Sequence, residues 1–286
     1  MDDQQFPASS SAERILTRRG FATVAAVAGV AVATQARAEV TETDVTIKTK
    51  DGVADAAFFH PAGKGPWPGV IIFTDILGLR PAFRDMGRRM AAEGYAVVVP
   101  NPFYRTRKAP VLDGPFDFSK PEDRAKLVPL TSPLNRATAT TDVTAYLAWL
   151  DKQPQVNKRR KIGVQGYCMG GPFTFVAAAT APKRVGAAGS FHGGGLVTDK
   201  PDSPHLLIPQ MKASLAVCIA ANDDQRQPDA KDKLRAAFDA AHVNASVEVF
   251  AGAQHGWCVK DGPVYDPAKA EKAWAELLSL YGRALA

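Results

Sequence analysis

"GVQGYCMGGPFT", Gly163 to Thr174, contains the strongest local signal for the fold of this chain. Apolar residues lie on both sides of it, so its glycine-rich middle predicts a sharp strand-to-helix turn with Cys168 at the tip. Gly166 and Gly170 are expected because side chains at those positions would clash in so tight a turn. The turn would place the thiol at a helix N-terminus, whose unpaired N–H groups favour an anion. We therefore predict that Cys168 is a nucleophile; the alternative is a small apolar side chain packed under the turn.

The segments on either side of this turn alternate between strand and helix patterns. Strands are predicted at residues 45–49, 54–60, 69–74, 95–100, 161–165, 187–191, 215–220 and 246–250. Helices are predicted at residues 83–93, 137–150, 172–180, 229–241 and 267–284. Parallel strands need a crossover connection between them, and helices supply it here. We therefore predict one α/β domain with a mostly parallel central sheet and helices on both faces.

Residues 101–135 interrupt this alternation with short pieces separated by prolines. A loop of this length that persists in a compact domain is often a binding element. We expect the segment to lie beside the sheet.

A cysteine nucleophile needs a base, and the base needs a residue that orients it. Hydrolases with this type of turn carry nucleophile, acid and histidine in that order along the chain. "LAVCIAANDDQ" places Asp223 just past a buried strand, and "VEVFAGAQHGWC" places His255 in the loop after the next strand. Both follow strand carboxyl ends, where ligands bind in open α/β sheets. A capping aspartate and a surface histidine are the alternatives, and His192 in "FHGGG" is the competing histidine.

The first 38 residues have the pattern of an export signal. Arg18 and Arg19 precede a short run rich in Ala and Gly, which ends in the small-x-small motif "ARA" at 36–38. The paired arginines resemble the twin-arginine signal of bacteria, which implies transient contact with the twin-arginine export machinery. The run is too short and too weakly apolar for a membrane anchor. We expect cleavage, a periplasmic mature domain over 39–286 that begins at Glu39, and no stable membrane insertion.

Composition argues against several other classes of protein. The formal charge is +6, but Lys and Arg are scattered among acids and the densest run, 158–161, directly precedes a strand, so we predict no nucleic-acid partner. The three cysteines have no CxxC spacing. That spacing argues against a cysteine-based metal site.

From about residue 45 to its end the chain resembles the dienelactone hydrolase (carboxymethylenebutenolidase) family of the α/β-hydrolase fold. "GYCMGG", "AANDD" and "AGAQHGW" match that family's nucleophile turn, acid-bearing turn and histidine loop. The resemblance implies a hydrolase of lactone or carboxylic ester bonds that acts through a triad of Cys168, His255 and Asp223, with no metal or organic cofactor. The backbone N–H groups of Ile76 and Met169 would form the oxyanion hole.

The resemblance also implies residues that regulate the thiol and hold the substrate. In the family a glutamate after an early strand contacts the resting cysteine, and this chain has Asp75 there, one methylene shorter. The family's type enzyme holds its substrate's carboxylate with two arginines, one of which follows the histidine. No arginine closely follows the histidine here, so the chain departs from the family's type enzyme at this position. The candidates for substrate binding are Tyr104, Arg105, Arg107, Trp257 and Lys260.

Two other functions remain open at this point. The chain could be a non-catalytic, exported small-molecule binding protein that keeps the hydrolase fold. A thiol-redox protein that pairs Cys168 with Cys218 or Cys258 is disfavoured because no CxxC motif is present. The expected partner is a small-molecule ester or lactone.

Overall fold

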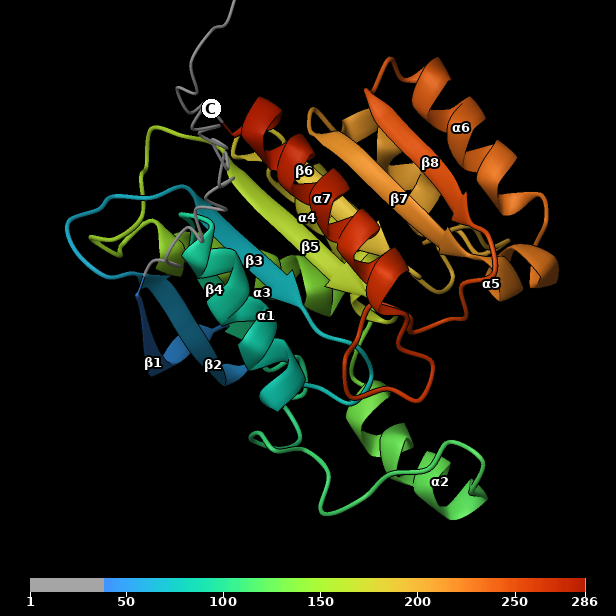
Figure 1. The fold of residues 1–286 in the computed structure, drawn as a ribbon, viewed down its shortest axis with the longest axis horizontal. Coiled ribbons are helices and arrows are strands. Elements are labelled where there is room, and N and C mark those ends of the chain that lie inside the picture. Colours follow the sequence, from blue (N-terminus) through green and yellow to red (C-terminus); the bar gives the residue numbers. More distant parts are fainter. Residues whose placement is uncertain (1–38, 286) are drawn as a thin grey trace, which may run out of the picture. The chain divides into compact units, whose positions relative to one another are not determined.

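The computed structural model describes residues 39–285, and the predicted export signal over 1–38 lies outside them. Its centre is an eight-stranded sheet in the order β1-β2-β4-β3-β5-β6-β7-β8 (Figure 1). The strands are β1 (Val40–Thr49), β2 (Gly52–Pro61), β3 (Gly69–Phe73), β4 (Ala96–Pro100), β5 (Ile162–Tyr167), β6 (Val185–Phe191), β7 (Ser214–Ala220) and β8 (Ala245–Phe250). β2 pairs antiparallel with β1 and β4, and the other pairings are parallel. The predicted mostly parallel sheet is therefore confirmed.

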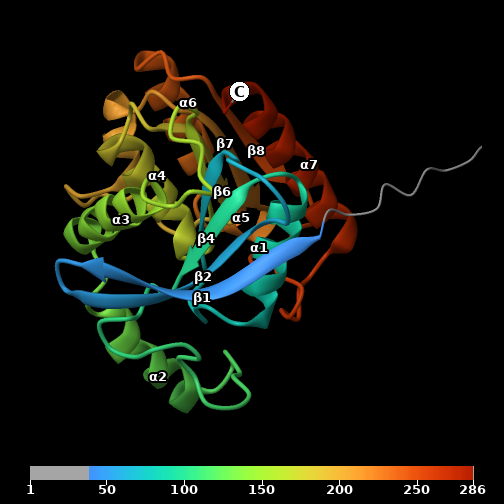
Figure 2. The ribbon, with the colours of Figure 1, turned by 90° about the vertical axis from the view of Figure 1, so that its left-hand side faces the viewer.

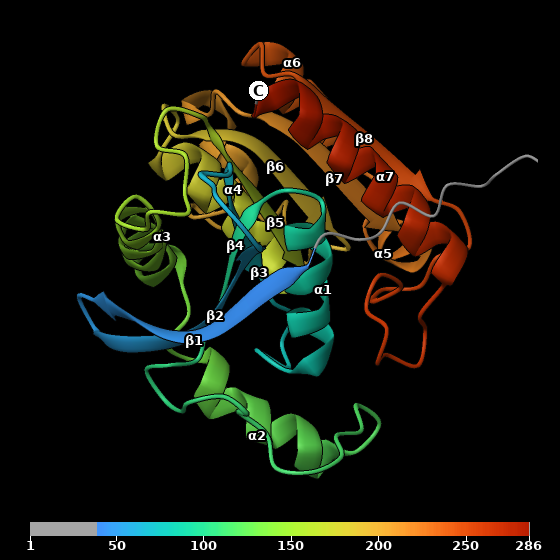
Figure 3. The same cartoon turned by 60° about the vertical axis from the view of Figure 1, so that its left-hand side comes forward.

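Helices cover both faces of this sheet, and each face has its own apolar core. On one face lie α1 (Pro81–Ala92) and α7 (Pro267–Ala284). On the other lie α3 (Arg136–Leu150), α4 (Gly170–Thr180) and α6 (Ala230–Ala240). Figures 2 and 3 show the two groups on opposite sides of the strands. The central strands β3, β4, β5 and β6 are buried throughout, which explains why their residues are apolar or glycine except for the buried Gln165 and Ser190.

Three helical pieces were not predicted: α2 (Pro121–Thr131), α5 (Ala221–Arg226) and a 3₁₀ helix over Pro204–Gln210. α2 lies inside the segment that the sequence indicated as irregular. Its proline at the first helical position is compatible with a helix, because the N–H that proline lacks has no partner there. The sequence did not predict α2 because Pro129 lies in the helix interior and the apolar residues show only a weak helical period.

The turn between β5 and α4 has the strained geometry that its sequence predicts. Cys168 has a φ of 51°, in the left-handed region that non-glycine residues seldom adopt. A Cβ on Gly166 would lie 2.0 Å from the carbonyl oxygen of Gly170, and one on Gly170 would lie 2.4 Å from that of Phe73. The backbone segments thus approach too closely for any residue but glycine at 166 and 170, and this approach lifts Cys168 to the carboxyl edge of the sheet.

Within residues 39–285, no helix combines the length and the apolar character that a bilayer crossing requires.

Candidate active site

Hydrogen bonds from the backbone of Cys168 join the nucleophile turn to the carboxyl end of β6. The backbone N–H of Cys168 donates to the carbonyl oxygen of Phe191 and to Nδ1 of His192, each at 3.1 Å. Cys168 is partly buried, whereas the other two cysteines are buried. The strained residue is thus fixed through its backbone rather than through its side chain.

His255 and Asp223 meet at this same edge of the sheet. His255 Nδ1 lies 2.6 Å from Asp223 Oδ2, and the His255 backbone N–H donates to the side chain of Asn222. Asp223 lies in α5, directly after β7, and His255 lies in the loop after β8. Because β7 and β8 are parallel neighbours, their carboxyl ends bring the two residues together.

The environment of His255 favours its protonated form. Burial lowers the pKa of His255, but hydrogen bonds to Asp223 and to Cys168 outweigh burial and raise the pKa to about 10. Since Nδ1 faces Asp223, the other side of the ring is left for the thiol. Together, Asp223, His255 and Cys168 can stabilise a thiolate next to an imidazolium.

The two backbone N–H groups expected to bind an oxyanion have no hydrogen-bond acceptor within residues 39–285. Among the described residues, neither the Ile76 nor the Met169 N–H donates a hydrogen bond. Met169 follows Cys168 at the start of α4, and Ile76 lies in the loop between β3 and α1. An unpaired N–H at each position is what an oxyanion hole requires.

Asp75 forms a salt bridge with Arg80, a residue that no sequence pattern marks as part of the site. Arg80 Nη1 and Nη2 donate to the two Asp75 carboxylate oxygens at 2.6 and 2.8 Å. The same guanidinium donates to Asp261, at 2.7 Å from Nε and 2.9 Å from Nη2. Asp75 Oδ1 also accepts from the Leu77 N–H at 2.9 Å. Within residues 39–285, Asp75 makes no hydrogen bond to Cys168, so the thiol-regulating role stays a prediction.

Arg80 therefore joins the loop that carries Ile76 to the loop that carries His255. No sequence signal identifies it, because Asp261 lies far along the chain and only the fold brings the two loops together.

His192 is the second residue whose part in the site emerges only from the structure. Its ring is 1% exposed and packs edge-to-face against His255 and Trp257, with ring centroids 5.1 Å apart in both contacts. Its φ of 40° also lies in the left-handed region. Burial, together with repulsion from His255, holds the pKa of His192 well below 6.5. His192 is thus a neutral support for both Cys168 and His255, and the "FHGGG" motif was its only sequence signal.

This buried histidine predicts a loss of stability in acid. The unfolded chain binds a proton on His192 near pH 6.5, whereas the folded protein binds it only at a much lower pH. Between those two values the free energy of unfolding falls as the pH falls, by up to about 1.4 kcal/mol per pH unit for this group. His192→Asn, which tolerates the left-handed conformation, is expected to remove that part of the slope. Denaturant unfolding at pH 6.5 and 5.5 measures how the free energy of unfolding changes with pH. An equal change in the wild type and in His192→Asn would contradict the prediction.

Most of the side chains predicted to bind substrate are engaged elsewhere. Tyr104 donates to Asp142 at 2.7 Å, and Arg105 binds both oxygens of the same carboxylate at 2.8 and 2.7 Å. Arg107 pairs with Asp113 at 2.7 Å on the surface. Trp257 is fully buried and packs in the apolar core on the α1 and α7 face of the sheet. Substrate contacts by these four residues stay predictions.

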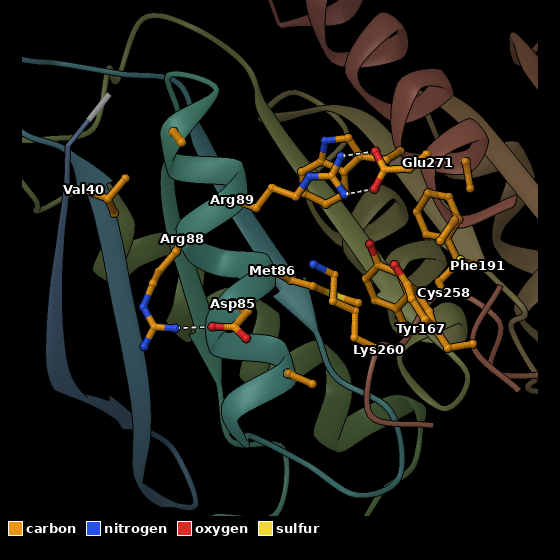
Figure 4. A pocket seen from close by; sticks show the side chains of 16 residues that line it. Val40, Asp85, Met86, Arg88, Arg89, Tyr167, Phe191, Cys258, Lys260 and Glu271 are labelled. Carbon is orange, nitrogen blue, oxygen red and sulfur yellow. Dashed lines mark hydrogen bonds and ion pairs between the residues drawn. The ribbon is translucent and has the colours of Figure 1, made fainter. Parts of the chain in front are cut away.

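Lys260 lies in a separate pocket between α1 and α7, of about 620 Å³. Figure 4 shows its side chain running into this pocket beside Met86, near Tyr167. The ion pairs Arg88–Asp85 and Arg89–Glu271 border the same space. The residues that line the pocket do not include Cys168 or His255.

The other two thiols have no chemical activation. Cys218 and Cys258 are buried, and burial raises the pKa of each well above 9. All three cysteines are free thiols. No three His, Cys, Asp or Glu side chains in residues 39–285 are grouped so as to hold a metal ion.

The sheet order and the nucleophile turn between a buried strand and a helix define the α/β-hydrolase fold. A model of the dienelactone hydrolase family matches residues 54–285, and the chain therefore belongs to that family of hydrolases.

Relatives over most of the chain agree with this assignment. A carboxymethylenebutenolidase homologue of Methylorubrum extorquens is 27% identical, with 94% of each chain covered. The carboxymethylenebutenolidase of Pseudomonas putida is 28% identical, over 58% of this chain and 67% of its own.

Solved structures show the same fold at lower identity. A dienelactone hydrolase-like promiscuous phosphotriesterase from metagenomic libraries matches with a TM-score of 0.70 at 22% identity, over 86% of this chain and 99% of its own. The dienelactone hydrolase of Anabaena variabilis matches with a TM-score of 0.59 at 17% identity, over 86% of this chain and 99% of its own.

Proposed function

We propose that this hydrolase cleaves lactone or carboxylic ester bonds by acyl transfer to Cys168, with His255 as base and Asp223 orienting it. The observation that carries the proposal is the 2.6 Å contact between His255 Nδ1 and Asp223, with Cys168 among the groups that raise the pKa of the same ring. This is the arrangement in which a nucleophile, a base and an orienting carboxylate act together.

In the first half of the proposed reaction the Cys168 thiolate attacks the substrate carbonyl carbon and forms a C–S bond. The carbonyl oxygen becomes an oxyanion, which the N–H groups of Ile76 and Met169 stabilise by about 3 kcal/mol each. When the intermediate collapses, the C–O bond to the leaving alkoxide breaks and the His255 imidazolium gives the alkoxide its proton. The product of this half is a thioester on Cys168.

In the second half a water molecule replaces the alcohol. His255, now neutral, takes a proton from the water as its oxygen attacks the thioester carbonyl. The C–S bond breaks, the carboxylic acid leaves and the thiolate–imidazolium pair is restored. Asp223 keeps Nδ1 protonated and the ring in place during both halves.

Alkylation of Cys168 by iodoacetamide tests the activated thiol without a substrate. In the wild type we expect fast labelling, and in His255→Ala a rate lower by about 100-fold, because the imidazolium no longer stabilises the thiolate. Mass spectrometry of the modified peptide measures the rate. His60→Ala, which changes a histidine at the end of β2, is the matched control and is expected to label at the wild-type rate.

The same experiment weighs the alternative of a non-catalytic binding protein. In a non-catalytic binding protein His255 is not expected to increase the reactivity of the Cys168 thiol. Equal labelling rates in the wild type and His255→Ala would therefore contradict the proposed function. Cys218 and Cys258 are internal controls in each sample, because both are buried and are expected to stay unlabelled.

A further inference from the structure

We infer that the substrate of this hydrolase carries an apolar, uncharged acyl group, which binds against the side chains of the 101–135 segment; the inference rests on the proposed function. Phe103, Val111, Leu127 and Leu130, here called the cap cluster, form a small apolar core of their own. It is separate from the two cores of the sheet. Figure 1 shows α2, which carries two of these residues, beyond the carboxyl ends of β3 and β5.

The cap cluster touches the two residues whose N–H groups would hold the oxyanion. Ile76 and Met169 are both partly buried hydrophobic residues that pack against it, and Leu77 does the same. In the proposed mechanism the substrate carbonyl oxygen points at the N–H groups of Ile76 and Met169. The acyl group attached to that carbonyl therefore lies within reach of their side chains and of half-buried neighbours in the cap, such as Phe116.

Two arginines in the loops that follow β3 and β4 are already neutralised by carboxylates, whereas the exposed Arg226 of α5 lies 3.7 Å from Asp223. Arg80 is bound to Asp75 and Asp261, and its side chain is only 14% exposed. Arg105 is held by Asp51 and Asp142 and is 11% exposed. A substrate carboxylate would have to displace a protein carboxylate from either guanidinium.

Two cations that form no ion pair within residues 39–285, Lys260 and Arg136, line other pockets. Lys260 lines the pocket between α1 and α7, and Arg136 lines one beside the start of α4. Neither pocket is lined by Cys168, Ile76 or Met169. A carboxylate placed against the apolar cap would lose its hydration without gaining a partner, which is costly. An apolar acyl chain would instead gain from leaving water.

A pair of matched esters tests the inference. 4-Nitrophenyl butyrate and mono-4-nitrophenyl succinate share the leaving group, and the terminal methyl of the first is a carboxylate in the second. After subtraction of the rate with Cys168→Ala, we expect kcat/KM for the butyrate to exceed that for the succinate by about 10- to 100-fold. A kcat/KM for the succinate equal to or above that for the butyrate would overturn the inference while the hydrolase function stands.

Two neighbouring phenylalanines provide a matched pair of variants. Phe116 packs on the cap cluster, whereas Phe118 contacts Phe116 but is 50% exposed and lies outside the cluster. Phe116→Ala is expected to lower kcat/KM for the butyrate by about tenfold and leave that for the succinate within twofold. Phe118→Ala is expected to change neither. An equal loss for both esters in Phe116→Ala counts against an acyl site on the cap.

The remaining outcomes separate this inference from the proposed function. If neither ester is hydrolysed faster than by Cys168→Ala, the proposed function fails, and the inference fails with it. If the succinate is preferred and Arg136→Gln or Lys260→Met removes that preference, the substrate is carboxylated and the named cation binds it, which overturns the inference alone.

Discussion

Replacement of Cys168 by alanine is expected to lower kcat for 4-nitrophenyl acetate by on the order of 10⁵-fold. The Cys168 sulfur is the atom that forms the acyl intermediate in the proposed mechanism, and the other two thiols, Cys218 and Cys258, are buried. The backbone hydrogen bonds that hold residue 168, to Phe191 and to His192, do not involve the side chain. The free energy of unfolding is therefore expected to change by only about 1 kcal/mol.

Steady-state hydrolysis and denaturant unfolding of the same preparation measure both quantities. Cys218→Ala is the matched control, because it removes another thiol of the chain from a position in β7, and its kcat is expected to stay close to wild type. A Cys168→Ala protein that keeps most of the wild-type turnover would remove the basis of the mechanism.

Asp223→Asn is expected to lower kcat by about 10⁴-fold, the second largest effect. The carboxylate accepts from His255 Nδ1 at 2.6 Å, fixes the tautomer and favours the imidazolium. An amide keeps the shape but not the charge, so the His255 pKa is expected to fall from its raised value of about 10. Proton NMR of the His255 ring measures the pKa, and steady-state hydrolysis measures kcat.

The adjacent residue gives the control for this change. Asp224 pairs with Lys231 at 2.7 Å and makes no contact with His255 among the described residues. Asp224→Asn is therefore expected to keep kcat within about threefold of wild type. Similar losses in the two variants would mean that the effect comes from a disturbed α5 rather than from a missing orienting charge.

Much of the site could be predicted from the sequence, because the motifs that mark it are short or follow a fixed order along the chain. The glycines at 166 and 170 are required by backbone contacts next to Cys168, so a short motif is enough to identify the turn. Asp223 and His255 follow successive strands of a parallel sheet, so strand order alone predicts that they lie near each other. The mostly parallel sheet itself followed from continuous apolar runs separated by helical periods.

The parts that the sequence did not predict depend on long-range contacts or on weak local patterns. α2 was missed because it contains Pro129, has only a weak apolar period and is held through the contribution of Leu127 and Leu130 to the cap cluster. Arg80 was missed because its partner Asp261 belongs to another loop. The salt bridges by which Arg105 joins the hairpin to α3 were likewise not predicted, because Asp51 and Asp142 lie far from it along the chain.

Local sequence patterns were enough to predict the fold class, the family and the three residues proposed for chemistry, because each prediction rests on a pattern within one segment or on chain order. The twin-arginine signal in residues 1–38 is likewise a prediction from sequence patterns. Which side chains have partners already depends on contacts between distant segments in the folded protein. Arg80, Arg105 and Asp75 are paired with charged residues of the protein, and most of these partners come from distant segments. The burial of His192 depends in the same way on side chains that pack around the sheet.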